Sequence, residues 1–217
     1  MMRKKLIVFL GIDGAGKSTL TNLITNELNE KYGFKVKNFW FRSKIQIYIS
    51  SILNKLKNKS FKNNKSKIEF NNKTKYTQKF ISELYLYMVL LDYFVISILF
   101  IKIPLLLGRN IVCDRYIYDV ILDLASDFNY SDEKLRSLIN SKLFLEPDII
   151  YLINVPIDIA KNRRPEHSTK ELVSKIESLE KFKEYNSINS KIIELNGAEK
   201  LPVILGKIEN SLIETML

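Results

Sequence analysis

The stretch Gly11–Thr19 constrains the fold more than any other part of this chain. It reads Gly-Ile-Asp-Gly-Ala-Gly-Lys-Ser-Thr and fits the pattern G-x-x-x-x-G-K-[ST], whose glycines let the backbone wrap around an anion. The apolar run Leu6–Leu10 precedes it, and apolar residues at helical spacing follow it between Leu20 and Leu28. The order strand, tight turn, helix is the context that a phosphate-binding loop requires.

The residue types in this loop predict its chemistry. Successive backbone N–H groups and the positive end of the following helix dipole attract a polyphosphate. Lys17 can reach the outer phosphates as a compact positive charge. The Ser18 hydroxyl is placed to ligate a magnesium ion bound to those phosphates. The alternative is a glycine turn that only joins a strand to a helix.

The segment Asn110–Tyr116 contains a second cluster. Its apolar run is followed by an acid, a base and an aromatic ring, Asp114, Arg115 and Tyr116. Ligands of open parallel sheets collect at the carboxyl ends of strands, so Asp114 is expected near the phosphate loop if the two strands are neighbours. There Asp114 can hold magnesium directly or through water, and Arg115 can brace a transferring phosphoryl group. The alternative is a salt-bridged strand end.

A third cluster, Lys161–His167, follows another apolar strand and a short helical turn. Phosphoryl transfer spreads charge over the transferring oxygens, so a kinase gains from mobile arginines that close over them. Arg163 and Arg164 are suitably placed in the sequence for that role. The alternative is a solvated basic helix end. His167, the chain's only histidine, is interpreted as a surface loop residue.

Length and cysteine content limit the class of protein. A chain of 217 residues, 46% of them hydrophobic, can form one domain of ordinary size, or at most a domain with an insertion. The single cysteine, Cys113, excludes an internal disulfide, fits a reducing, cytoplasmic compartment and is interpreted as a core residue. The long apolar segment 84–107 is interrupted by Asp92, Lys102 and Pro104, so we expect a buried helix rather than a membrane span.

The excess positive charge lies in one segment. Residues 42–79 contain eleven basic residues and one acid, Glu69, which accounts for the net charge of +10. Interleaved asparagines make this segment typical of a solvated loop or mobile excursion. A compositional bias of the source, a basic flap that gathers anionic substrates, and nucleic-acid binding are the three explanations. Few aromatic residues are interleaved, which disfavours stacking on single strands.

Alternating apolar runs and helical patterns predict an α/β fold with a parallel sheet. Strands are expected at 5–10, 35–41, 110–114, 148–155 and 191–195, and helices at 17–31, 79–107, 116–127, 131–143, 157–164, 170–187 and 199–215. This organisation predicts a single domain over residues 1–217. It carries a basic excursion at about 43–79 and a short lid at about 161–170.

Together the three clusters resemble the thymidylate kinase family of P-loop nucleoside monophosphate kinases. The loop from Phe9 to Thr19 looks like the family's opening, including its aspartate at Asp13. The triplet Asp114-Arg115-Tyr116 is similar to the family's Asp-Arg-Tyr/His motif, and the region of Arg163 and Arg164 lies where the family has its lid. The spacing is compatible over nearly the whole chain. The resemblance implies a three-layer fold with a five-stranded parallel sheet flanked by helices, and commonly a homodimer.

The resemblance also implies roles by position. ATP phosphates would be held by Gly11, Asp13, Gly14, Ala15, Gly16, Lys17, Ser18 and Thr19, and magnesium by Ser18 and Asp114. The acceptor would be bound by Asp13, Arg42, Tyr93 and Arg115. Catalysis would rest on Lys17, Asp114, Arg115, Arg163 and Arg164.

The implied activity is magnesium-dependent transfer of the ATP γ-phosphate to a nucleoside monophosphate, with dTMP as the favoured acceptor. Where the family has Glu-Pro-Gly-Gly after its arginine, this chain has Ser43-Lys44-Ile45 after Arg42. Where the family has a phenylalanine and an arginine that recognise thymine, this chain has Val89 and Tyr93. A kinase acting on another small acceptor is therefore one alternative. An ATP-regulated nucleic-acid-binding module is another, which the segment 42–79 suggests, although nucleic acid is the less favoured partner.

Overall fold

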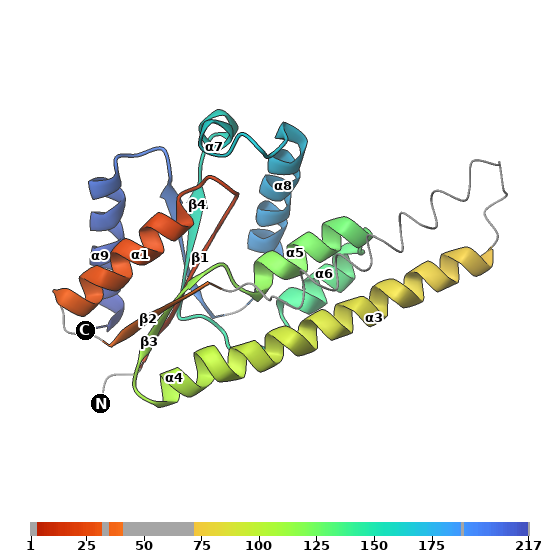
Figure 1. The fold of residues 1–217 in the computed structure, drawn as a ribbon, viewed down its shortest axis with the longest axis horizontal. Coiled ribbons are helices and arrows are strands. Elements are labelled where there is room, and N and C mark those ends of the chain that lie inside the picture. The colour runs from red at the N-terminus through yellow and green to blue at the C-terminus, as the bar shows by residue number, and fades with distance from the viewer. Residues whose placement is uncertain (1–3, 32–34, 41–71, 188, 217) are drawn as a thin grey trace. The chain divides into compact units, whose positions relative to one another are not determined.

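A parallel sheet of five strands is the framework of the part of the chain that this computed structural model describes, residues 4–31, 35–40, 72–187 and 189–216 (Figure 1). The strands are β1 (Leu6–Gly11), β2 (Val36–Trp40), β3 (Asn110–Asp114), β4 (Ile149–Asn154) and β5 (Lys191–Asn196), in the spatial order β2-β3-β1-β4-β5. The five predicted strands are thereby confirmed, and no boundary differs by more than one residue.

Contacts between residues divide the chain into two compact units. The first, which we call the sheet unit, comprises Met1–Phe41 and Ser97–Leu217, and the second comprises Arg42–Ile96. Of the second unit the structure describes residues 72–96, which lie in helix α3 (Asn72–Ser97). Most of the basic excursion predicted at 43–79 lies outside the described residues, so the single-domain organisation stays a prediction.

Helices cover both faces of the sheet. They are α1 (Lys17–Glu30), α5 (Ile117–Phe128), α6 (Asp132–Ile139), α7 (Ile157–Arg163), α8 (Thr169–Tyr185) and α9 (Leu201–Met216). Figure 1 shows α1 and α9 on one side of the sheet and α5, α6 and α8 on the other. These three layers confirm the predicted α/β architecture, and the predicted lid segment 161–170 joins the end of α7 to the start of α8.

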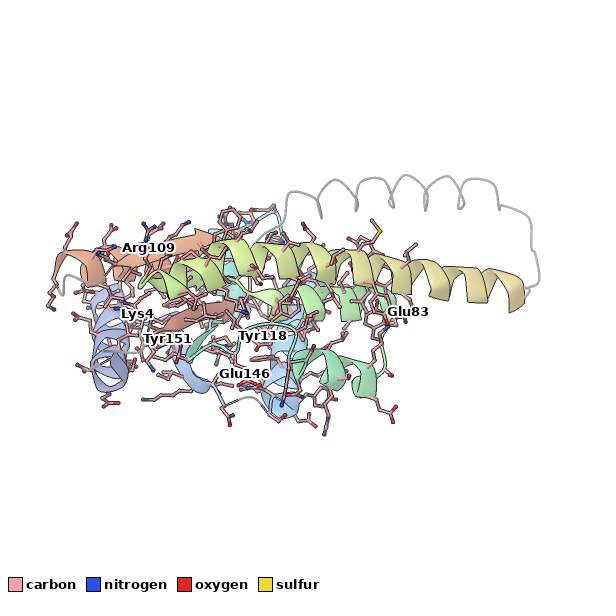
Figure 2. The ribbon with its side chains drawn as sticks, turned by 90° about the horizontal axis from the view of Figure 1, so that it is seen from below. Lys4, Glu83, Arg109, Tyr118, Glu146 and Tyr151 are labelled. Atoms are coloured by element: carbon pink, nitrogen blue, oxygen red, sulfur yellow. The ribbon has the colours of Figure 1, made fainter. Side chains whose placement is uncertain are left out.

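Aromatic side chains pack within the sheet and within its helical layers. Tyr151 of β4, labelled in Figure 2, is fully buried, with its ring centroid 4.9 Å from that of Phe9 on β1. Its hydroxyl lies 2.6 Å from Ser211 Oγ on α9, so a buried polar group is satisfied where the helix meets the sheet. In the other layer, the ring centroids of Tyr118 on α5 and Phe182 on α8 are 4.9 Å apart.

The helix predicted at 79–107 differs from the observed one in extent and in regularity. α3 begins at Asn72, and a π-helical turn, η1 (Ile98–Lys102), separates it from α4 (Ile103–Leu106). The N–H of Ile103 bonds the carbonyl of Ile98, and the next residue, Pro104, has no N–H to donate. The hydrogen-bond ladder therefore changes its spacing immediately before the proline.

The helix predicted at 131–143 is also shorter than expected. α6 ends at Ile139, and the side-chain amide of Asn140 donates to the carbonyls of Arg136 and Tyr185. A side chain that bonds the last helical carbonyls ends the helix. Phe144, which continued the apolar pattern, is buried within the turn that follows.

One helix among the described residues, Glu83–Leu106, is long and apolar enough to cross a membrane by length and composition alone. Asp92 and Lys102 interrupt this segment, and a mostly buried core helix of a soluble protein meets the same criterion. In this helix 39% of the apolar window is buried, so the buried helix expected from the sequence is confirmed only in part.

Cys113 provides a test of the core. It is fully buried in β3, and burial raises the pKa of its thiol well above the ordinary value, with the neighbouring Asp114 charge adding to the effect. We expect the native protein to resist labelling by a thiol reagent such as DTNB and to react fully once unfolded in urea. Rapid labelling of the native protein, followed by absorbance, would contradict the described packing of β3.

Candidate active site

The phosphate loop follows β1 at the carboxyl end of the sheet, as the sequence predicts. Gly11 and Gly14 have φ angles of 152° and 85°, in the region that favours glycine. A Cβ at Gly14 would lie 2.6 Å from the carbonyl oxygen of Ala160 on α7. Glycine at this position therefore allows α7 to approach the loop backbone closely.

The start of α1 contributes the remaining loop residues. Gly16 is the N-cap residue in a left-handed conformation, and Lys17, Ser18 and Thr19 form the first helical residues. Their N–H groups belong to the first turn, which has no intrahelical acceptors, so they are available to an anion. Ala15 is buried beneath them, whereas Ser18 and Thr19 are exposed. The predicted phosphate-binding residues thus lie together.

Lys17 lies folded inside the loop. Its side chain is buried, and Nζ donates to the carbonyl of Gly11 at 2.7 Å and to that of Ile12 at 2.8 Å. Burial and the nearby Arg115 charge lower the pKa of Lys17 to about 8. The ammonium group is therefore hydrogen-bonded to neutral carbonyl oxygens, which are much weaker partners than a polyphosphate.

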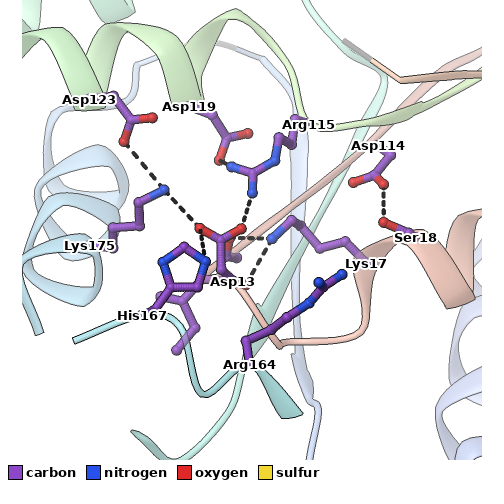
Figure 3. Close-up of polar contacts among 12 residues, drawn as sticks. Asp13, Lys17, Ser18, Asp114, Arg115, Asp119, Asp123, Arg164, His167 and Lys175 are labelled. Carbon is purple, nitrogen blue, oxygen red and sulfur yellow. Dashed lines mark hydrogen bonds and ion pairs between the residues drawn. The ribbon is translucent and has the colours of Figure 1, made fainter. Parts of the chain in front are cut away.

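Ser18 and Asp114 meet between α1 and the end of β3. The Ser18 hydroxyl donates to Oδ2 of Asp114, and Oδ1 of Asp114 is buried with no hydrogen-bond partner among the described residues (Figure 3). An alcohol oxygen and a carboxylate with an unused oxygen are the ligands that Mg²⁺ prefers. This donor pair fits a magnesium ion that is also bound to phosphate. The described residues contain no group of three or more acidic, histidine or cysteine side chains able to hold a metal alone.

Asp13 is the centre of a charge cluster beside the loop (Figure 3). Its Oδ1 pairs with Arg115, and its Oδ2 lies 3.1 Å from Lys175 Nζ and 3.8 Å from His167 Nε2. Burial raises the pKa of the Asp13 carboxyl, but the charges of Arg115, Lys175 and Lys17 outweigh burial and hold it well below the usual range. Asp13 is therefore a carboxylate at neutral pH.

Arg115 is held on two sides. Besides its pair with Asp13, its Nη1 lies 3.8 Å from Oδ1 of Asp119 on α5. Its backbone has a φ of 70°, an uncommon value for a residue other than glycine, and its N–H bonds the carbonyl of Phe9 at 3.1 Å. The turn after β3 is thus fixed to β1, and the guanidinium lies beside the phosphate loop.

The two lid arginines differ in their partners. Arg163 donates to the backbone carbonyls of Gly14 and Gly197, each at 3.1 Å, so it joins α7 to the phosphate loop and to the turn after β5. Arg164 is exposed and pairs with Glu166 at 3.4 Å. The structure therefore brings Arg163 to the loop as a contact to its backbone, whereas Arg164 pairs with a residue of the lid itself.

The structure does not test two of the predicted acceptor residues. Arg42 lies outside the described residues, and Tyr93 lies on α3 in the second unit. Their roles stay predictions.

Sequence reasoning missed several members of the cluster. Asp119 and Asp123 follow Arg115 at four-residue intervals, and this helical spacing was a usable signal. Lys175 carried no signal, because it is one of several lysines along α8. His167, predicted to be a surface loop residue, is half-buried near Asp13.

Comparison with known proteins agrees with this geometry. The family model described as "Thymidylate kinase" matches residues 9–208. The chain belongs to the thymidylate kinase family. It is 28% identical over 193 residues to a "Probable thymidylate kinase" of Methanococcus maripaludis strain C7, covering 86% of this chain and 78% of that protein. It is 26% identical over 215 residues to a "Probable thymidylate kinase" of Methanocaldococcus jannaschii, covering 97% and 98%.

A solved structure supports the fold. The crystal structure of thymidylate kinase from Ehrlichia chaffeensis superposes with a TM-score of 0.61 at 17% identity, covering 97% of this chain and 98% of that one. Membership of the family makes this protein a nucleoside monophosphate kinase that uses ATP, and the family's reaction is the phosphorylation of dTMP to dTDP.

The charge cluster predicts a pH dependence of stability. Because the pKa of Asp13 is lowered on folding, its carboxylate stabilises the native state above the unfolded pKa, and this contribution is lost as pH falls below it. We expect Asp13→Asn to lower the free energy of unfolding by about 1–2 kcal/mol near pH 7. The difference from wild type should shrink below about pH 4, as measured by urea unfolding. A difference independent of pH would contradict the assigned ion pairs.

Proposed function

We propose that this chain transfers the γ-phosphate of ATP to dTMP, forming dTDP and ADP, with Mg²⁺ as its metal cofactor. The observation that supports this most directly is the meeting of Lys17, Ser18, Asp114 and Arg115 at the carboxyl ends of β1 and β3 in a chain of the thymidylate kinase family. These are the groups that phosphoryl transfer requires: a phosphate cradle, a metal site and a cation beside the phosphates.

The phosphate loop binds ATP in this proposal. The N–H groups of Gly14 and of Gly16 to Thr19 would bind the β- and γ-phosphates, whereas the N–H of Ala15 bonds the carbonyl of Ile12 at 3.2 Å. Lys17 exchanges the carbonyls of Gly11 and Ile12 for phosphate oxygens. The phosphate charge favours the ammonium form of Lys17, which burial disfavours in the free protein. The loop thus contributes charge stabilisation where negative charge develops.

Ser18 and Asp114 are the residues that would hold Mg²⁺. Both are oxygen donors, and the unpartnered Oδ1 of Asp114 supports this assignment. When bound, the ion supplies positive charge that neutralises the phosphates.

The transfer step joins an oxygen of the acceptor's 5′-phosphate to the γ-phosphorus, while the bond from that phosphorus to the bridging oxygen of ADP breaks. Arg115 moves from Asp13 to the acceptor phosphate, and Asp13 then faces the acceptor sugar. Arg163 braces the loop through Gly14. Arg164 is proposed to close over the transferring group, and Arg42 and Tyr93 to complete the acceptor site.

A different small acceptor is the second candidate. This chain lacks the residues that bind and recognise the acceptor in the family's pattern. In their place it has Ser43-Lys44-Ile45 and the pair Val89 and Tyr93. This observation affects the acceptor's identity and leaves the ATP side unchanged. The nucleic-acid alternative depends on the segment 42–79, most of which lies outside the described residues.

We also propose a homodimer and a cytoplasmic location. Exposed apolar side chains on η1, on α4 and at the residue that ends α4, namely Leu99, Ile103, Leu106 and Leu107, support a protein interface on the sheet unit. The single buried thiol, Cys113, supports a reducing compartment.

An acceptor panel tests this function. ADP release from ATP is measured with dTMP, dUMP, UMP, CMP, AMP or GMP, with and without Mg²⁺, and without acceptor. We expect dTMP to stimulate release by at least about a hundredfold over the no-acceptor rate, and removal of Mg²⁺ to abolish it.

The outcomes separate the candidates. Stimulation by a different monophosphate would overturn the dTMP assignment and retain the kinase. No stimulation by any monophosphate would contradict the proposed function.

A further inference from the structure

Lys175 lies between two carboxylates that come from different elements of the sheet unit. Its Nζ, carried by α8, is 3.1 Å from Oδ2 of Asp13 in the phosphate loop and 3.5 Å from Oδ1 of Asp123 on α5 (Figure 3). The side chain is 30% exposed, whereas that of Asp123 is 48% exposed. The contact with Asp13 is therefore both the shorter and the better shielded of the two.

The two oxygens of Asp13 have different cationic partners. Arg115 pairs with Oδ1, and Lys175 pairs with Oδ2. His167 Nε2 approaches Oδ2 at 3.8 Å, beyond hydrogen-bond distance. Lys17 contributes its charge, but its ammonium bonds loop carbonyls. Lys175 is thus the cation that hydrogen-bonds the oxygen not paired with Arg115.

This division affects how strongly Arg115 is held. A guanidinium and a carboxylate with two open oxygens form a two-bond fork, which is stronger than a single contact. Lys175 competes with Arg115 for Oδ2, and its positive charge beside Asp13 weakens the attraction of this carboxylate for the guanidinium. In the proposed reaction Arg115 must leave Asp13 to reach the acceptor phosphate, so a weaker hold favours acceptor binding.

We propose that Lys175 is a positioning residue for the acceptor: by engaging Oδ2 of Asp13, it weakens the hold of Asp13 on Arg115. This inference rests on the proposed function, because it assigns Arg115 and Asp13 to the acceptor. Lys175 itself touches neither reacting group. Its effect is therefore expected on acceptor binding and not on ATP binding.

Steady-state kinetics with the acceptor that the panel identifies test the proposal. Lys175→Met keeps the unbranched side chain as far as Cε and removes the charged Nζ. We expect it to raise the acceptor KM about tenfold, while kcat and the KM for ATP change less than about twofold. Lys175→Arg should restore the acceptor KM. Lys181→Met is the matched control, because Lys181 lies on the same helix in an exposed pair with Asp132 at 2.9 Å.

A double variant distinguishes positioning from a general structural role. If Lys175 acts through Asp13, then Lys175→Met should add nothing to the acceptor KM of Asp13→Asn, whereas independent effects would multiply. Multiplying effects, or an unchanged KM in Lys175→Met, would overturn the proposal.

The remaining outcomes are also decisive. If Lys175→Met does not fold, Asp123→Asn provides the second test. This variant removes the longer ion pair of Lys175, the one with Asp123, and leaves its contact with Asp13 in place. The acceptor KM should therefore change less than about twofold, and a tenfold rise would overturn the proposal. A wild-type protein that phosphorylates no monophosphate overturns the proposed function, whereas an active wild type with an unaffected Lys175→Met overturns this inference alone.

Discussion

The parallel pairing of β1 with β3 is the constraint on which the site depends. The register sets Phe9 beside Asp114, and the N–H of Arg115 continues the pairing by bonding the carbonyl of Phe9 at 3.1 Å. Side chains alternate between the faces of a sheet, so a slip of one residue would move the Asp114 side chain to the opposite face from Ser18. The buried apolar residues of both strands hold the register, and the core thereby determines where the metal donors meet.

The cations of the site have partners within the protein. Lys17 bonds two loop carbonyls, and Arg115 and Lys175 share the carboxylate of Asp13. Substrate binding is then an exchange of partners, because each phosphate must replace an existing acceptor. This exchange links the two substrates: Asp13 lies in the loop that binds ATP, and it also holds the arginine proposed for the acceptor. Arg163, bonded to Gly14 and Gly197, holds the backbone of that loop in place.

Features that depend on local pattern could be predicted from the sequence. Short apolar runs gave every strand to within one residue, and the glycine and lysine spacing located the phosphate loop. The meeting of Ser18 with Asp114 followed from the rule that parallel strands present their carboxyl ends together.

Features that depend on long-range contacts could not be predicted. Lys175 reaches Asp13 only because α8 packs beside α5 with one particular face inward, and no motif identifies that face among the helix's lysines. The early end of α6 depends on Asn140 bonding Tyr185, which is distant in sequence. The partners of Arg163 are backbone carbonyls, which no residue pattern encodes.

The central claim is that Lys17 and the loop amides bind the phosphates of ATP, and calorimetric titration of the protein with ATP and Mg²⁺ tests it most directly. The account predicts binding by wild type and a loss of at least about thirtyfold in affinity for Lys17→Met, since a charge-assisted contact to phosphate is removed. Lys181→Met should bind as wild type does. Equal affinity in the Lys17→Met variant, or a wild-type protein that does not bind ATP at millimolar concentration, would contradict the account.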